Sequence, residues 1–408
     1  MLHDRYARRI EQFGVRYESE WVAEVKTGGR YSDEHVRERE ATLLLDRDLD
    51  LTRYCGRLWP IFARRTGIFS PLERLQRRGE AEEIVLFHPD PAYERLAAAA
   101  IDAVPFRNAH REEVAFAYLE GSADDLTPRF SRVVDSEPLA ANRRLAGAGA
   151  AIVADLELLA AAGEVRPLAA PPAGVFVVGR ESDVYLHPDA ELFAGTVLDV
   201  REGPVVIAAG ARVGQLSYVA GPSYVGPGTH VENCRLVAPV VLGRQCRVGG
   251  EIEASFVGDY SNKHHEGFLG HSLVGRWVNV GALATTSDLK NNYGEVRLEV
   301  PTTFLPRAGG ELARVATGSI KFGSIVADCV KIAIGLRLNA GTVLDVGSNV
   351  FGGSPPRYLP PFSWGTAGAR YELDRFLADC EKIFARRGQS PSGPLRQLAA
   401  YYWKNLAG

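Results

Sequence analysis

The densest group of side chains able to do chemistry lies in residues 261–271, SNKHHEGFLGH. Transfer of an acyl group to an amine needs a base for the amine proton, and an imidazole has a pKa near about 6.5. His264 and His265 supply two adjacent candidates, and Lys263 and Arg276 are candidates for holding a phosphate. A loop histidine is more often an ordinary surface residue, so only the adjacent pair at a break in the surrounding pattern favours catalysis.

A second polar group, Lys290-Asn291-Asn292-Tyr293, follows about twenty-five residues later. Asparagine clusters are typical of turns, so these residues are weaker candidates for binding a substrate. Farther along, Lys321 and Lys331 are candidates for contacting an anionic cofactor, although either is equally compatible with a solvated face.

The elements that must position these residues show a six-residue period. Aliphatic residues recur at Ile207, Val213, Val219, Val225, Val231 and Val237, and again at Ile320, Val326, Ile332, Leu338, Leu344 and Val350. Small or β-branched residues follow four positions later at Ala211, Ser217, Ser223, Thr229, Val330, Thr342 and Ser348. Helices have a period of 3.6 and flat strands a period of two, so neither explains a strict six. Three six-residue units per triangular coil predict a left-handed parallel β-helix with the aliphatic residues inside.

The period is interrupted at two places. The residues after Val257 are polar as far as Gly267, and the pattern is lost again from Ser287 to about Ser319. Excursions from a rigid solenoid usually serve binding, so both are expected to carry the site.

The rest of the chain predicts two further parts. Residues 1–175 alternate short apolar runs (42–45, 84–87 and 114–118) with helical segments, which indicates an α/β domain with a mostly parallel sheet. The β-helix is expected over 176–355, after a linker at 167–174. Residues 356–408 carry helical spacing and are expected to cap the open end of the coils.

Composition excludes several classes of protein. The formal net charge of the 408 residues is −3, so no overall field favours nucleic acid. Five widely spaced cysteines form no disulfide framework, and we expect a reduced, cytoplasmic protein. No apolar stretch is long enough to cross a bilayer, so no membrane partner is expected.

Three motifs together carry a resemblance. Residues 261–270, Trp277-Val278-Asn279-Val280-Gly281-Ala282 and Asp288-Leu289-Lys290-Asn291-Asn292-Tyr293-Gly294 resemble the sugar nucleotidyltransferase/acetyltransferase proteins related to the bifunctional N-acetylglucosamine-1-phosphate uridyltransferase/glucosamine-1-phosphate acetyltransferase. The similar stretch continues through 342–343, 349–352 and 361–365.

This resemblance implies acetyl transfer from acetyl-CoA to an amino-sugar phosphate. His265, three residues before Phe268-Leu269-Gly270, would be the base, and His264 would contact the substrate with Lys263. Asn279 would line the same site, and Asn291, Asn292 and Tyr293 would hold the acceptor sugar. Arg276, Ala282, Lys321 and Lys331 are the candidates for contacting acetyl-CoA. The resemblance also implies a homotrimer with acetyl-CoA between neighbouring β-helices.

Two other functions stay open. The N-terminal half departs from a nucleotidyltransferase pattern, because its one glycine-rich candidate, Lys26-Thr27-Gly28-Gly29-Arg30, follows a poor strand. We expect a shortened, degenerate domain there, and Mg²⁺ would enter only if it retained nucleotidyl transfer with the β-helix as a trimer scaffold. A zinc enzyme like the γ-class carbonic anhydrases is the third reading, using His230, His264, His265 and His271. The histidines lack the separated spacing of that class, so no metal site is predicted.

Overall fold

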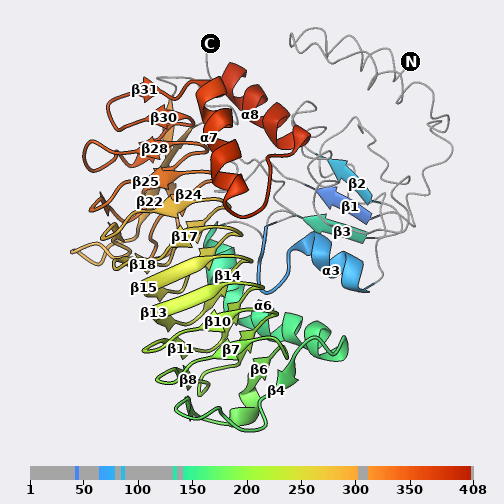
Figure 1. The fold of residues 1–408 in the computed structure, drawn as a ribbon. Helices are drawn as coiled ribbons and strands as arrows, with labels where there is room; N and C mark the ends of the chain where they lie inside the picture. The colour runs from blue at the N-terminus through green and yellow to red at the C-terminus, as the bar shows by residue number, and fades with distance from the viewer. Residues whose placement is uncertain are drawn as a thin grey trace, which may run out of the picture.

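The computed structural model describes residues 42–45, 64–78, 84–87, 132–135, 141–301 and 311–405. From Phe176 to Trp364 the chain winds into a parallel β-solenoid whose coils stack from the green to the red end of the molecule (Figure 1). Most coils supply three short strands, one to each side. The parallel β-helix predicted from the six-residue period is confirmed, and its left-handed sense stays a prediction.

The strands are grouped here by the side on which they stack. The first face contains β7 (Glu191–Leu192), β10 (Arg212–Val213), the start of β13 (His230–Val237), the start of β15 (Arg247–Glu253), β17 (Asn262–Lys263), β20 (Asn279–Val280), β25 (Lys331–Ile332), β28 (Asn349–Val350) and β30 (Ser363–Trp364). The second face contains β5 (Phe176–Val178), β8 (Val197–Asp199), β11 (Tyr218–Ala220), the ends of β13 and β15, β18 (Phe268–Gly270), β21 (Thr285–Thr286) and β26 (Arg337–Leu338). The third face contains β6 (Val184–Leu186), β9 (Val205–Ile207), β12 (Ser223–Val225), β14 (Val240–Leu242), β16 (Phe256–Val257), β19 (Leu273–Val274), β24 (Ile325–Val326), β27 (Val343–Leu344) and β29 (Tyr358–Leu359). We call the bends after these faces the first, second and third corners.

The register shows that one coil takes three six-residue units. Arg212 on β10 pairs with His230 on β13, 18 residues later, and His230 pairs with Arg247 on β15 after 17 more. Farther up, Lys331 on β25 pairs with Asn349 on β28, again 18 residues apart. The predicted repeat and the observed coil therefore have the same length.

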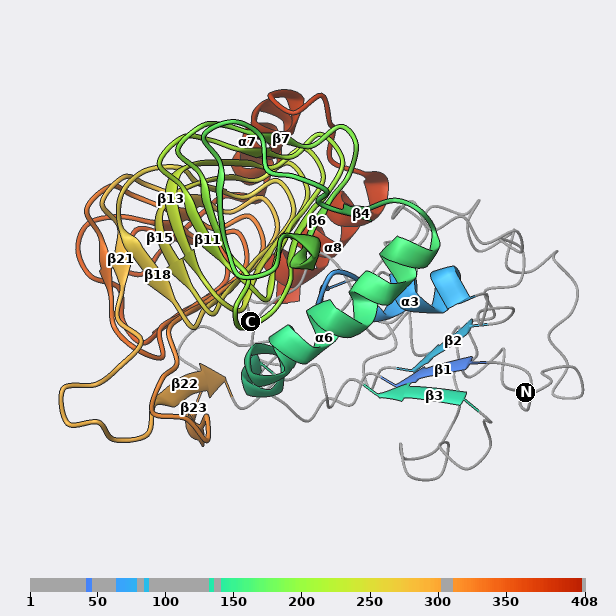
Figure 2. The same ribbon diagram turned by 90° about the horizontal axis from the view of Figure 1, so that it is seen from below.

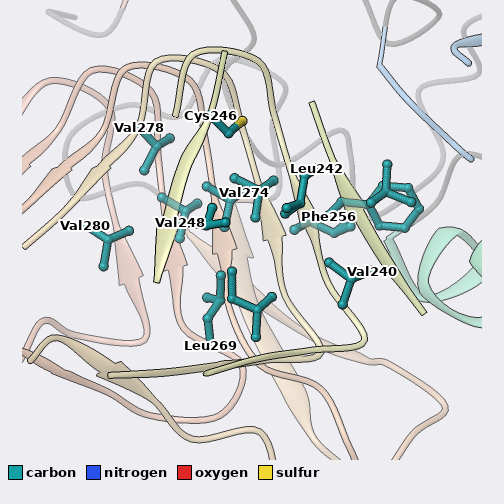
Figure 3. Close-up of a cluster of buried hydrophobic side chains, with 14 of the residues drawn as sticks. Val240, Leu242, Cys246, Val248, Phe256, Leu269, Val274, Val278 and Val280 are labelled. Carbon is teal, nitrogen blue, oxygen red and sulfur yellow. The ribbon is translucent and has the colours of Figure 1, made fainter. Parts of the chain in front are cut away.

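The interior of the solenoid is filled by the aliphatic residues of the repeat. Ile207, Val213, Val219, Val225 and Val231 have no exposed surface, and Val326, Ile332, Leu338, Leu344 and Val350 are buried on the upper coils. Figure 3 shows such side chains from successive coils gathered in the middle coils. Burial of each contributes roughly 1.5–3 kcal/mol, which makes the stack of coils the main core of the molecule.

Three details of the predicted repeat were wrong. Val237 is half-buried, and its neighbour Leu236 points into the coil instead. Ile320 is 51% exposed, because it lies in the chain returning to the stack rather than inside a coil. The residues after Val257 are an ordinary coil rather than an excursion. Val257, Lys263 and Leu269 follow at intervals of six and are all buried, so the lysine occupies an interior position that the other coils give to an aliphatic residue.

The second excursion is real and contains an antiparallel hairpin. It leaves the coils after β21, and an isolated bridge between Leu289 and Lys321 joins its two ends. Its strands β22 (Arg297–Pro301) and β23 (Leu312–Ala316) pair with each other and project beside the solenoid (Figure 2). Leu298 and Val300 are fully buried, because β22 packs against the third face at β27 and β29.

The third corner has the same backbone conformation on eight successive coils, from β9 to β29. Gly210, Gly228, Gln245, Tyr260, Trp277, Cys329, Gly347 and Phe362 all have φ between 53° and 69°. The amide of each upper residue donates to the coil below, as from Trp277 N to Asp259 O at 3.0 Å. This bonding stabilises left-handed angles that bulky residues otherwise avoid.

The C-terminal helices lie along this corner rather than over the end. In α7 (Leu373–Ala385), Phe384 stacks on Trp277 with ring centroids 3.8 Å apart, and Trp277 stacks on Tyr260 at 4.4 Å. Helix α8 (Gly393–Asn405) packs against α7. The upper end of the solenoid is closed instead by β31 (Ala369–Arg370), which pairs antiparallel with β30. The expected helices are thus present at the side of the coils.

The described residues of the N-terminal part form a small parallel sheet and helices. Strands β1 (Thr42–Leu45), β2 (Ile84–Phe87) and β3 (Arg132–Asp135) lie in the order β2-β1-β3, and α3 (Pro71–Arg78) follows the described segment 64–70. The predicted runs 42–45 and 84–87 are confirmed as strands. The run 114–118 and the glycine-rich residues 26–30 lie outside the described residues, and the nucleotidyltransferase-like fold stays a prediction.

Helix α6 (Ala141–Ala161) belongs physically with the solenoid, because it packs on the third face at β12 and β14. The proposed linker is also part of the stack, since β4 (Arg166–Pro167) pairs with β6 and a short 3-10 helix (Glu181–Asp183) precedes β6. Within the described part of the chain no helix is both long and apolar enough to cross a membrane.

Buried ion pairs fasten the segment 64–70 to the third corner. Arg64 Nη2 lies 2.8 Å from Asp328 Oδ2, and Arg65 Nε lies 3.4 Å from Asp259 Oδ1. Burial alone raises the pKa of Asp259, but the guanidinium groups of Arg65, Arg276 and Arg244 outweigh it and lower that pKa to about 2. The carboxylate is therefore ionised and central to this contact.

Candidate active site

The histidine pair lies at the first corner, between β17 and β18. The His265 side chain is exposed, and its ring meets the ring of His264 edge-on with centroids 5.1 Å apart. His264 Nε2 lies 3.7 Å from Glu232 Oε2 on the coil below. His264 Nδ1 is buried and has no hydrogen-bond partner. The corner thus presents one accessible imidazole beside a second one that is held near a carboxylate.

Lys263 supports this corner from inside the solenoid. Its ammonium donates to Gly249 O at 2.8 Å and to His265 O at 2.7 Å, and the residue is only 3% exposed. Burial lowers the pKa of Lys263. Because the ammonium faces the backbone, its predicted contact with a substrate phosphate has no support in this arrangement and stays a prediction.

Exposed apolar side chains flank His265 along the same corner. Leu283 on the next coil is 66% exposed and Ile334 on the coil after it is 76% exposed. Their coils are joined by backbone bonds, from Leu283 N to Glu266 O and from Gly335 N to Ala282 O, both 2.8 Å. Ala282 therefore lies directly above the histidine pair, as its assignment to the same site requires.

Asn279 and Lys331 point outward from the first face. Asn279 accepts a bond from Asn262 Nδ2 at 2.8 Å, and it pairs with Lys331 on the next coil. Lys331 Nζ lies 5.8 Å from the ring centre of Tyr371, which precedes α7. These two predicted residues are neighbours of each other on the face that leads into the first corner.

The remaining predicted residues lie elsewhere. Arg276 is at the third corner, where its Nη2 lies 3.8 Å from Asp259 Oδ2. Asn291, Asn292 and Tyr293 form an exposed turn of the excursion, in which Tyr293 N donates to Lys290 O at 2.9 Å. Within one chain, the structure does not bring these four residues together with His265.

A second cluster lies at the second corner, and we call it the His271 cluster. The sequence analysis named His271 and Lys321 separately but missed their partners Asp288 and Glu253. His271 Nδ1 lies 2.7 Å from Asp288 Oδ2, and Lys321 Nζ lies 3.0 Å from Glu253 Oε1. The hydrogen bond with His271 lowers the pKa of Asp288, and the bond to Glu253 raises the pKa of Lys321. Lys321, a candidate cofactor contact, is therefore already paired here.

One signal in the sequence could have found this cluster. Glu253, His271 and Asp288 are 18 and 17 residues apart, which is one coil in each case. Residues one coil apart stack at the same corner, so a search at that interval for acids, histidines and cysteines would have selected them.

Comparisons with known proteins support a distant relation over part of the chain. No protein-family model matches. The bifunctional protein GlmU of Synechococcus elongatus is 27% identical over 173 residues, covering 39% of this chain and 35% of that protein. GlmU of Cyanothece is 28% identical over 173 residues, covering 38% of each chain, and GlmU of Acaryochloris marina is 31% identical over 121 residues, covering 26% of each. The alignments thus span between 26% and 38% of the length of these relatives.

The chain is therefore a distant, partial relative of bifunctional GlmU proteins, and the resemblance seen in its motifs is confirmed at that level. Among solved structures, the acetyltransferase domain of PglB from Neisseria gonorrhoeae in complex with acetyl coenzyme A aligns with 60% of this chain and 90% of its own, at 16% identity and a TM-score of 0.20. A similarity at that score carries no argument about function.

Proposed function

We propose that this protein is an acetyl-CoA-dependent N-acetyltransferase acting on an amino-sugar phosphate, with His265 as the general base. The observation that carries the proposal is an exposed imidazole on a rigid corner of a hexapeptide-type solenoid. The partial relation to GlmU proteins supports the same reading.

The chemistry needs one proton acceptor at that corner. The acceptor's amine attacks the thioester carbonyl, an amide bond forms, and the carbon–sulfur bond breaks. The imidazole of His265 takes the proton that the amine loses, and the departing sulfur becomes the CoA thiol after protonation. Lys263 assists indirectly, because its bond to the His265 carbonyl holds the backbone that carries the base.

The apolar side chains at the first corner suit the acetyl donor. Leu283 and Ile334 form an exposed strip beside His265, and an exposed strip of this kind is usually covered by a ligand or another chain. In the proposed homotrimer, acetyl-CoA would lie between this corner and a neighbouring copy. Of the predicted cofactor contacts, Ala282 and Lys331 suit this placement, while Arg276 and Lys321 are engaged at other corners.

The alternatives have less support. The glycine-rich residues proposed for nucleotidyl transfer lie outside the described part of the chain, so no described residue favours that activity or its Mg²⁺. For a zinc enzyme with several histidine ligands, the described residues offer little support. His230 and His264 both lie near Glu232, at 3.8 and 3.7 Å, but the one described group of three potential ligand atoms within 4.8 Å of one another includes His271 as its single histidine.

The test of the base is release of CoA thiol from acetyl-CoA and glucosamine-1-phosphate or a related amino-sugar phosphate. His265→Ala should lower kcat by about 10²–10⁴-fold, the usual contribution of a general base, without changing thermal unfolding. His187→Ala removes another histidine with an acidic neighbour, Asp189 at 3.7 Å, and serves as the matched control. Full turnover by His265→Ala would refute the assignment.

A third variant separates the two histidine sites. If His271→Ala abolishes turnover while His265→Ala does not, the base lies at the second corner and our assignment is overturned. Binding of the donor is tested independently, because acetyl-CoA at 100 times its Kd should stabilise the fold by about 2.7 kcal/mol.

A further inference from the structure

The His271 cluster joins three successive coils through side chains that commonly bind metals. Glu253 ends β15, His271 follows β18 and Asp288 follows β21. One potential ligand atom of each, an imidazole nitrogen or a carboxylate oxygen, lies within 4.8 Å of the others. The side chains are 24%, 18% and 12% exposed, so an ion could reach them from solvent.

The backbone around the cluster is tightly fixed. His271 N donates to Glu253 O, Gly323 N donates to His271 O, and both distances are 2.9 Å. Glycine at position 270 gives the cluster space, because a Cβ there would lie 2.6 Å from Asp288 Oδ2 and 2.4 Å from the Phe268 ring, so those side chains would have to move. The chain thus leaves room for the carboxylate in a rigid frame, as a preorganised site needs.

The charges of the cluster favour an added cation. Glu253 and Asp288 carry two negative charges, and among the described residues Lys321 supplies the one ammonium paired with them. The two carboxylates thus outnumber the single ammonium group paired with them. The ammonium of Lys321 occupies a place beside Glu253 that a metal ion would compete for.

We propose that Glu253, His271 and Asp288 bind one divalent transition-metal ion of the class that accepts mixed nitrogen and oxygen ligands, such as Zn²⁺ or Mn²⁺. Bonds of about 2.0–2.2 Å to such an ion place ligand atoms within roughly 4.2 Å of one another. Small side-chain rotations close the difference from the observed spacing. Three protein ligands leave positions for water, and Lys321 swings away as the ion enters.

The ion ties the coils together where the long excursion begins and ends. Asp288 precedes Leu289 of the bridge to Lys321, and Phe322 N donates to Asp288 O at 2.8 Å. Metal binding should therefore raise the thermal stability of the protein as well as saturate at one ion per chain.

The test is calorimetric titration of the full chain, freed of metal, with ZnCl₂ and separately with MnCl₂. We expect one ion per chain, and we expect His271→Ala and Asp288→Asn each to weaken binding by at least about tenfold. Lys321→Met should tighten binding several-fold, since it removes the competing cation. The matched control is Lys382→Met. Its ammonium lies 3.1 Å from the Asp379 carboxylate within α7, and its loss should leave metal binding unchanged.

Several outcomes would overturn the site. Neither ion saturating at one per chain would do so, as would binding that His271→Ala leaves intact or that Lys321→Met weakens. If Asp288→Asn does not fold, Glu253→Gln and Lys321→Met still decide. His265→Ala should leave metal affinity unchanged, so failure of the acetyltransferase proposal and failure of this one are separable.

Discussion

A buried lysine in an aliphatic frame is the most unusual single residue of the molecule. Lys263 occupies the interior position between Val257 and Leu269, where its stem packs inside the coil and its ammonium bonds two carbonyls. The residue type does not predict this interior position, because a lysine among polar neighbours is usually exposed to solvent. Extending the six-residue count through the polar segment would have placed it inside.

Replacing this lysine should cost stability. Lys263→Met keeps the stem but leaves the carbonyls of Gly249 and His265 without a donor, which we expect to destabilise the fold by about 1–3 kcal/mol. Urea unfolding measures the change, with Lys290→Met at the excursion turn as a comparison. A more stable Lys263→Met would mean that desolvation of the ammonium outweighs its two bonds.

The same lysine should make the stability of the fold depend on pH. Burial lowers its pKa in the folded state, so between that pKa and the ordinary value near about 10.4 the unfolded chain binds more protons. Folding stability should therefore rise with pH across that window, and the rise should be absent in Lys263→Met. Unfolding curves at several alkaline pH values would show whether it is.

At the scale of elements, the repeat was predictable and its interruptions were only partly so. A six-residue period specifies both the strand length and the inward residue, which is why the interior positions from Ile207 to Val231 were found. The period shifts where Leu236, rather than Val237, turns inward, because the register of β13 shifts between Val231 and Cys234 at the first corner. The polar residues after Val257 suggested an excursion. The hydrogen bonds of the buried Lys263 instead keep that segment in the regular six-residue repeat.

The packing of α7 gives an element-scale prediction. Phe384 is buried and stacks on Trp277, so Phe384→Ala should destabilise the protein by about 3–5 kcal/mol and loosen α7 from the coils. Arg386→Ala changes an exposed residue two positions later and should alter the free energy of unfolding by no more than about 0.5 kcal/mol. Chemical unfolding followed by tryptophan fluorescence measures both. A loss below about 1 kcal/mol for Phe384→Ala would show that the stack does not hold the helix.

At the scale of the molecule, the contact between the N-terminal segment and the solenoid depends on charges far apart in sequence. Arg65 and Asp259 are 194 residues apart, and Arg64 and Asp328 are 264 apart. No local pattern relates such residues, so the docking of segment 64–70 could not be predicted. The helices α7 and α8 were predictable as helices, but their position along the third corner depends on aromatic partners in other coils.

This contact should make the fold sensitive to acid. The pKa of Asp259 in the fold is about 2, below its ordinary value, so its contribution is complete above about pH 4 and is lost as the pH falls toward 2. Asp259→Asn should destabilise the protein at pH 7 by about 3–5 kcal/mol, since it leaves buried guanidinium groups without their counter-charge. Its stability should also fall less steeply between pH 4 and 2 than that of the unsubstituted protein.

The control is Asp189→Asn, which changes an exposed carboxylate beside His187. It should keep the acid response of the unsubstituted chain. Equal slopes for Asp259→Asn and the unsubstituted protein would show that other carboxylates govern acid unfolding.

The side chains of the third corner decide where helices can pack along the solenoid. Gly210 and Gly228 on the lower coils and Gly347 on an upper coil carry no side chain there, while Tyr260, Trp277 and Phe362 carry aromatic rings. The same backbone bend thus presents bare backbone on some coils and an aromatic ring on others. A helix can pack only on the coils that carry these rings. The residue at one position per coil therefore decides where along the third corner a helix is held.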